Sequence, residues 1–171
     1  EALAAGRRWL DPVATNRLLA AYGIPIVPVQ VAATANEAAL LADPLLAMGR
    51  TVTLKVLSSE IAHKSDVDGV RLNLSSVAAV REAAAGILAR ARAAHPNALI
   101  EGVIVQPTVL RPKARELIAG IADDPVFGPA IVFGRGGTAV EVINDRELAL
   151  PPLDLRLAHE LIGRTRVSRI L

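Results

Sequence analysis

The feature of this sequence that most constrains its fold is the interleaving of helical apolar patterns with short β-branched runs. Apolar residues recur at helical spacing after Asp11, after Thr34, after the pair Ser75 and Ser76, and after Asp154, and these residues can cap helix N-termini. A polar segment, residues 111–115, is predicted to be a hairpin turn. Helices interleaved with strands, without strict βαβ alternation, predict an α+β fold with two lobes. The predicted strands are residues 24–31, 51–57, 69–74, 99–105, 116–121, 130–133 and 139–143.

The amino-acid composition excludes several classes of function. The 171 residues include no Cys, one Trp, one Tyr and two Phe. The absence of Cys excludes a disulfide scaffold, a thiolate metal site and a Cys nucleophile. The few aromatic residues and the scattered basic residues, with a formal net charge of +2, count against a nucleic-acid partner. No apolar run is long enough for a membrane span and no leader is evident, so the sequence predicts a cytoplasmic domain with no membrane partner.

A lysine inside an apolar strand is the first candidate site. Lys55 lies in the run 51–57, where its ammonium loses hydration unless it meets an anion or reaches solvent. The alternation of the run also fits an outward-facing lysine without a ligand, and the strand alone does not decide between the two.

A polar loop at residues 63–70 is the second candidate. It joins two predicted strands and contains His63, Lys64 and Ser65. Lysine, serine and successive backbone amides together can neutralise and hold a polyphosphate. An ordinary solvated hairpin loop fits the same residues, because no Walker-type motif is present.

A glycine cluster is the third candidate. Gly134, Gly136 and Gly137 lie between two predicted strands, where glycine allows close backbone approach or a positive φ. A tight hairpin explains them equally well. Downstream, Glu141 and Asp145 are four residues apart, a spacing that in a strand puts both on one face only if no bulge intervenes, and they are weak candidates for a hard-cation site.

These clusters occur in the order found in one known family. The chain resembles the ATP-grasp domain of NDP-forming acyl-CoA synthetases, which include ADP-forming acetyl-CoA synthetase and are related to the succinyl-CoA synthetase beta chain. The resemblance implies an ATP-grasp fold of two α/β lobes with the second lobe incomplete. It places an N-terminal lobe at 1–105, with a phosphate loop at 57–70, and a linker plus partial C-terminal lobe at 106–171. The matching segments are residues 54–70, 102–107, 116–120, 124–129, 133–142 and 150–153.

The resemblance also implies an activity. It is a ligase reaction, acid + CoA + ATP ⇌ acyl-CoA + ADP + Pi, with ATP/ADP and Mg²⁺ as cofactors. The CoA-binding and ligase modules are expected in the same polypeptide or a partner subunit. His63 matches a catalytic histidine that relays the phosphoryl group. The positions that match nucleotide-binding residues are Lys55 at the α/β phosphates, Lys64 and Ser65 in the phosphate loop, Gln106, Pro107 and Val109 at the adenine, Glu116 at the ribose or phosphates, and Gly134, Gly136 and Gly137.

The sequence departs from the family pattern in two places. Asp68 stands where the family loop carries the first of two glycines, and a carboxylate near a triphosphate weakens binding unless Mg²⁺ or Lys64 compensates. The chain also stops before a Glu-x-Asn-Pro type segment that supplies metal ligands, so this piece alone is not expected to complete catalysis. Asp68 motivates one alternative, a regulatory nucleotide-binding module of a protein N-acetyltransferase. A purely structural interaction domain is another.

Overall fold

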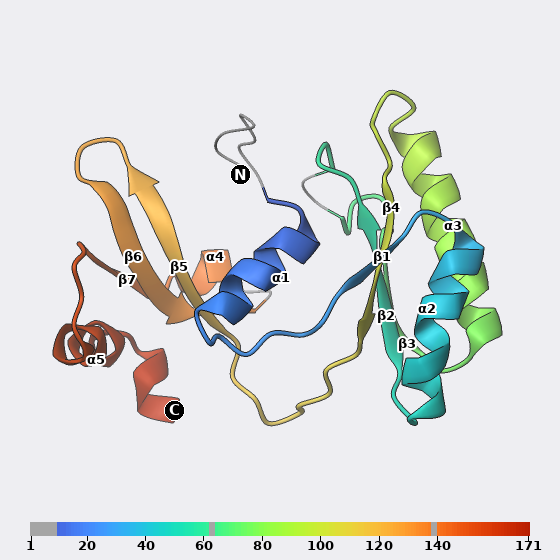
Figure 1. Cartoon of the computed structure of the whole chain (residues 1–171). Helices are drawn as coiled ribbons and strands as arrows, with labels where there is room; N and C mark the ends of the chain where they lie inside the picture. The colour runs from blue at the N-terminus through green and yellow to red at the C-terminus, as the bar shows by residue number, and fades with distance from the viewer. Residues whose placement is uncertain (1–9, 62–63, 138–139) are drawn as a thin grey trace. The chain divides into compact units, whose positions relative to one another are not determined.

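The structure is a computed structural model that describes residues 10–61, 64–137 and 140–171. The chain divides into two compact units, one ending at Leu110 and one beginning at Arg111 (Figure 1). The sequence predicts a boundary before Gln106, but that residue and Pro107 complete the last strand of the first unit. Within the described ranges, no helix has the length and apolar character needed to span a bilayer.

The first unit is built on a four-stranded antiparallel sheet with the order β1-β4-β2-β3. Strand β1 lies at the edge, as predicted. It is shorter than predicted, because Pro25 and Pro28 lack the amide hydrogens that a ladder needs. The elements are α1 (Pro12–Ala21), β1 (Gln30–Ala32), α2 (Ala35–Ala47), β2 (Val52–Leu57), β3 (Val70–Leu74), α3 (Val77–Ala94) and β4 (Gly102–Pro107).

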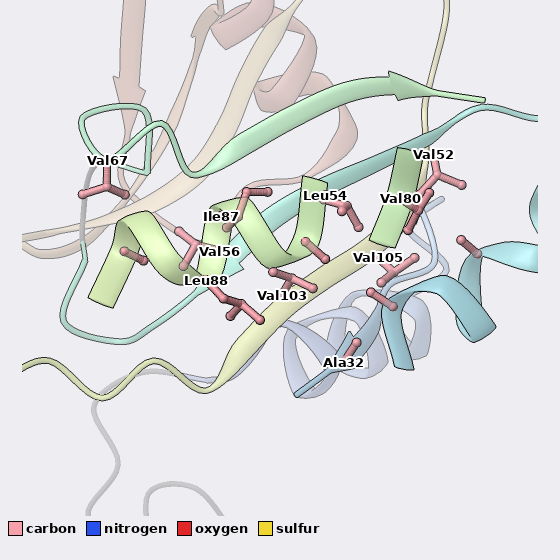
Figure 2. Packing of buried hydrophobic residues seen from close by; sticks show 14 of the residues in the cluster. Ala32, Val52, Leu54, Val56, Val67, Val80, Ile87, Leu88, Val103 and Val105 are labelled. Atoms are coloured by element: carbon pink, nitrogen blue, oxygen red, sulfur yellow. The ribbon is translucent and has the colours of Figure 1, made fainter. Parts of the chain in front are cut away.

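The core of this unit lies between the sheet and the pair of helices α2 and α3, which cover one face (Figure 1). Val52, Leu54 and Val56 alternate along β2 and are fully buried against the helices (Figure 2). Ala42 of α2 and Ala84 of α3 are also fully buried. Small side chains let the two helices approach each other and the sheet closely, which explains how an alanine-rich chain forms a dense core.

The second unit contains a three-stranded antiparallel sheet with the order β5-β6-β7. Asp124 closes the turn between β5 and β6, because its Oδ1 accepts hydrogen bonds from the amides of Val126 and Phe127 at 2.8 and 2.9 Å. The elements are β5 (Leu117–Asp124), β6 (Gly128–Arg135), α4 (Val140–Ile143), β7 (Arg146–Ala149), α5 (Leu155–Arg164) and the 3-10 helix η1 (Val167–Ile170).

The helix starts predicted from the sequence are confirmed. Side-chain oxygens of Asp11, Thr34, Ser76 and Asp154 each accept a hydrogen bond from the amide three residues later, at 2.8–3.2 Å. These caps satisfy amides that have no partner within the helix. Local chemistry therefore determines where α1, α2, α3 and α5 begin.

Two predictions for the second unit are wrong. The predicted strand at residues 139–143 is replaced by helix α4 at 140–143, and residue 139 lies outside the described ranges. The next strand along the chain to pair with β6 is β7, with Arg146 opposite Gly134. A short β-branched run adopts the state that its tertiary partners allow, so its local preference is overridden. Residues 111–115 are not a hairpin turn, because they join β4 to β5, which belong to different sheets.

The packing predicts the effect of truncating the central strand. Leu54→Ala should lower the free energy of unfolding of the first unit by about 2–5 kcal/mol, because it leaves a cavity in a fully buried site. Leu40→Ala on α2 is the matched control, since Leu40 is 73% exposed. Guanidinium unfolding followed by circular dichroism measures both, and equal midpoints for the two variants would contradict the assigned core.

Candidate functional site

Two predicted residues lie on the face of the first sheet that is opposite α2 and α3. Leu54 points toward the helices, so the alternation of a strand directs Lys55 to the other face. The register pairs Thr53 with Gln106 and Lys55 with Ile104. Gln106 is therefore a diagonal neighbour of Lys55 on the same face. Both side chains are half-buried, so a cation and a carboxamide from separate motifs are brought together.

The remaining candidates near β4 differ in exposure. Pro107 is buried at the end of β4, whereas Val109 follows the strand and is 50% exposed. Thr53 and Thr108 share a hydrogen bond of 2.8 Å between their hydroxyl oxygens, which links β2 to the residue that follows β4. His63 lies outside the described residues.

The turn at residues 64–69 carries Lys64 and Ser65 and is hydrogen-bonded to strand β2. Lys64 O accepts a hydrogen bond from Gly69 N at 2.8 Å, and Ser65 O accepts one from Asp68 N at 3.1 Å. Gly69 O in turn accepts from Val56 N at 2.7 Å. A Cβ at Gly69 would lie 2.6 Å from Val56 Cγ1 and 2.7 Å from Lys64 O. Only glycine fits this contact between the turn and the central strand.

A cavity of about 300 Å³ lies within the second unit. It brings together three predicted residues from distant parts of that unit, namely Glu116, Gly136 and Gly137. A volume of this order lies at the lower end of small-ligand sites. The described residues that line it are Ala114, Arg115, Glu116, Arg135, Gly136, Gly137, Ile143 and Val167.

The three predicted glycines of this unit have different roles. Gly136 N donates a hydrogen bond to Glu116 O at 2.7 Å. Gly137 has a φ of +93°, and a Cβ there would lie 3.1 Å from Glu116 Oε2. Gly134 is buried in β6, where a Cβ would lie 2.3 Å from Asp145 O. Gly134 therefore serves strand packing, whereas Gly136 and Gly137 border the cavity.

Two arginines of the cavity were missed from the sequence. Arg115 and Arg135 both line it and are exposed. The available signal was their position, since Arg135 lies inside the glycine cluster and Arg115 directly precedes Glu116. A guanidinium group can hold a phosphate or carboxylate through two parallel hydrogen bonds. The cavity therefore combines two guanidinium groups with glycine backbone, which are features of anion-binding sites, and it also contains the carboxylate of Glu116.

The metal candidates are not placed as the sequence predicts. Glu141 belongs to helix α4, so the strand spacing considered for Glu141 and Asp145 does not apply to this pair. The two carboxylate oxygens of Asp145 accept hydrogen bonds from the amides of Arg166 and Val167, each at 2.7 Å. Asp145 therefore holds the start of η1. In the part of the chain that the structure describes, no group of three or more His, Asp or Glu side chains could hold a metal ion.

Comparison with known proteins identifies the family. An ATP-grasp domain family matches residues 1–171. The "Acetate--CoA ligase [ADP-forming] I subunit beta" of Pyrococcus furiosus is 36% identical over 171 residues, which are 100% of this chain and 71% of that protein. The chain belongs to this ATP-grasp family. The sequence-based recognition and the ATP-grasp fold class are therefore confirmed.

Other ATP-grasp relatives extend the comparison. "Acetate--CoA ligase [ADP-forming] I" of Archaeoglobus fulgidus is 41% identical over 154 residues, but the chain spans only 22% of that protein's length. A solved acetyl-coenzyme A synthetase 1 of Ca. Korarchaeum cryptofilum, in complex with coenzyme A and Ca-AMPCP, aligns with a TM-score of 0.87 at 35% identity. That alignment covers 99% of this chain and 72% of the other. Another structure of that enzyme holds Mg-AMPPCP, with its phosphohistidine segment pointing towards the nucleotide binding site.

The close contact at Gly134 predicts a local steric effect. Gly134→Ala should destabilise the second unit by about 1–3 kcal/mol, because its methyl group would push β6 away from Asp145. Gly120→Ala is the matched control on the same sheet, since a Cβ there meets nothing within 4 Å. Hydrogen exchange at the Arg135 amide, which donates to Asp145 O, reports the contact. Equal exchange in the two variants would show that the strands tolerate the methyl group.

Asp145 predicts a pH-dependent contribution to stability. Burial alone would raise the pKa of its carboxyl, but hydrogen bonds from the amides of Arg166 and Val167 and the charge of Arg166 outweigh burial and lower it. A lowered folded-state pKa means that the contribution is present above the ordinary value of about 4 and is lost as the pH falls toward the folded value. Asp145→Asn should therefore destabilise the protein more at about pH 7 than at about pH 3. The same loss at both pH values, measured by urea unfolding with Asp123→Asn as the control, would contradict this assignment.

Proposed function

We propose that this chain is the nucleotide-binding part of an ADP-forming acyl-CoA synthetase. The observation that carries the proposal is the placement of Lys55 and Gln106 on one face of the first sheet, in a chain 36% identical over its full length to a named ligase subunit. The relatives described above are named as ligases. They give no support to a regulatory module of an N-acetyltransferase.

The chemistry proposed for this part is phosphoryl transfer between nucleotide and histidine. A neutral imidazole attacks the γ-phosphorus of ATP, an N–P bond forms, the bond to the bridging oxygen breaks, and ADP leaves with the electron pair. His63 is the residue proposed for this relay, because it matches the family's relay histidine and an unprotonated imidazole nitrogen is a competent phosphoryl nucleophile. In the opposite direction the same histidine returns the phosphoryl group to ADP.

The described residues supply binding and orientation, which account for most of the catalysis in phosphoryl transfer. Lys55 is proposed to neutralise phosphate charge, and Gln106 and its neighbours Pro107 and Val109 to bind the adenine edge. Lys64 and Ser65 are proposed to hold phosphates through the turn fastened by Gly69. In the second unit, Glu116, Gly136 and Gly137, which line the cavity, complete the proposed set of nucleotide-binding residues. Gly134, which the sequence also suggests for this set, supports them through strand packing.

The metal and the partner modules belong to the same proposal. Mg²⁺ is proposed to accompany the nucleotide, as in the related structure that holds Mg-AMPPCP. The described residues form no metal-binding cluster, so no step is assigned to a metal ion here. CoA binding and ligation are proposed to occur on modules of the same polypeptide or on a partner subunit, because the chain spans only 22% of the length of the Archaeoglobus fulgidus relative.

Two substitutions in the full-length protein separate binding from transfer. Lys55→Ala should weaken ADP binding about tenfold or more, because a charge-assisted contact with phosphate is lost. His63→Ala should leave ADP binding nearly unchanged and abolish ATP formation from acyl-CoA, ADP and phosphate. Calorimetry measures the first effect, and a coupled assay of ATP formation measures the second.

Each substitution has a matched control in the chain. Lys113→Ala removes an exposed lysine of the segment between β4 and β5, and His159→Ala removes an exposed histidine of α5. Both should behave like the unmodified protein. Undiminished turnover in His63→Ala would refute the relay, and unaltered ADP affinity in Lys55→Ala would refute the placement of the phosphates.

A further inference from the structure

Asp68 occupies a turn in which its carboxylate is held between two arginines. Its φ is +49°, in the left-handed region that Asp tolerates better than most residues. Both carboxylate oxygens accept hydrogen bonds from the guanidinium of Arg71, each at 2.5 Å. Arg90 Nε lies 3.3 Å from Asp68 Oδ2, and Arg90 Nη2 donates to Asp68 O at 3.4 Å. We call these three residues the Asp68 clamp.

The clamp connects three elements of the first unit. Asp68 belongs to the turn at residues 64–69, Arg71 to β3 and Arg90 to α3. The bidentate geometry with Arg71 is the stronger type of carboxylate–arginine pair. The hydrogen bond from Arg71 is the main cause that holds the pKa of Asp68 below its ordinary value, with the charge of Arg90 adding to it. The carboxylate therefore stays ionised and paired at neutral pH.

The same turn carries two of the residues proposed to bind phosphate. Asp68 N donates to Ser65 O, and the next residue, Gly69, donates to Lys64 O. The backbone that positions Lys64 and Ser65 is thus closed by hydrogen bonds at Asp68 and its neighbour. Fixing Asp68 against β3 and α3 limits the orientations that this backbone can adopt.

We propose that Asp68 is a positioning residue, which through Arg71 and Arg90 holds the turn at 64–69 in the conformation that binds the nucleotide phosphates. The inference rests on the proposed function, since it assumes that Lys64 and Ser65 meet those phosphates. Asp68 itself does not contact the nucleotide.

This role reverses the effect expected of Asp68 from sequence. The sequence predicts that a carboxylate beside a triphosphate repels it. In the structure one carboxylate is paired with two guanidinium groups, so the cluster carries a net positive charge. If through-space repulsion decided affinity, removing the carboxylate would tighten nucleotide binding. If positioning decides it, removing the carboxylate weakens binding.

The sign of the change in ADP affinity tests the inference. Asp68→Asn keeps the shape and the tolerance for positive φ but removes the charge. In the full-length protein it should raise the Kd for ADP about threefold or more, and Arg90→Gln should act in the same direction. The double variant should have a Kd for ADP no higher than that of the single variant with the higher Kd, because both substitutions disrupt the same clamp. Arg81→Gln, an exposed arginine of the same helix, is the control and should leave the Kd unchanged.

Further readouts separate positioning from general stability. In the turnover assay, Asp68→Asn should raise KM for ADP and leave KM for acyl-CoA unchanged, which a merely structural role would not do. Hydrogen exchange at residues 64–69 should become faster. Arg90→Gln alters no residue of the turn, so it preserves the test if Asp68→Asn does not fold.

The opposing outcomes are distinct. Tighter or unchanged ADP binding in Asp68→Asn, or unchanged binding in folded Arg90→Gln, overturns the positioning role and leaves the proposed function intact. Failure of the unmodified full-length protein to bind ADP overturns the proposed function and this inference with it.

Discussion

The pairing of β2 between β3 and β4 is the constraint on which the first unit depends. One register buries Leu54 and its alternate neighbours against the helices and directs Lys55 to the opposite face. A slip of one residue would place the lysine among apolar side chains, where its charge would lose hydration. The same register sets Gln106 diagonally beside Lys55. Core packing and the arrangement of the candidate site therefore follow from one set of strand contacts.

Close contacts at two glycines constrain the backbone next to the strands of both units. At Gly69 a turn touches the central strand, and at Gly134 strand β6 touches Asp145 at the start of β7. Neither position has room for a Cβ. The sequence suggests that Gly134 allows close approach to a ligand, but Gly134 approaches the backbone of Asp145. Gly69 approaches the Val56 side chain and the Lys64 carbonyl oxygen. Gly136 and Gly137 are the glycines that border a cavity.

Features set by neighbouring residues could be predicted from the sequence, whereas features set by distant partners could not. The N-caps depend on an amide three residues away, and the strand at Lys55 on a continuous apolar run. Helix α4 replaced a predicted strand because pairing with β6 selects β7 instead. Arg90 is 22 residues from Asp68, so no local pattern indicates the clamp. The cavity arginines come together only because β5 pairs with β6.

The central claim is that the two glycine-anchored segments, residues 64–69 and 134–137, bind nucleotide. Hydrogen exchange of the full-length protein with and without ADP and Mg²⁺ tests this most directly. We predict slower exchange in both segments when ADP is bound, with little change at the exposed end of the β5–β6 hairpin around Phe127. Unchanged exchange in both segments, under conditions where ADP is bound, would contradict the account.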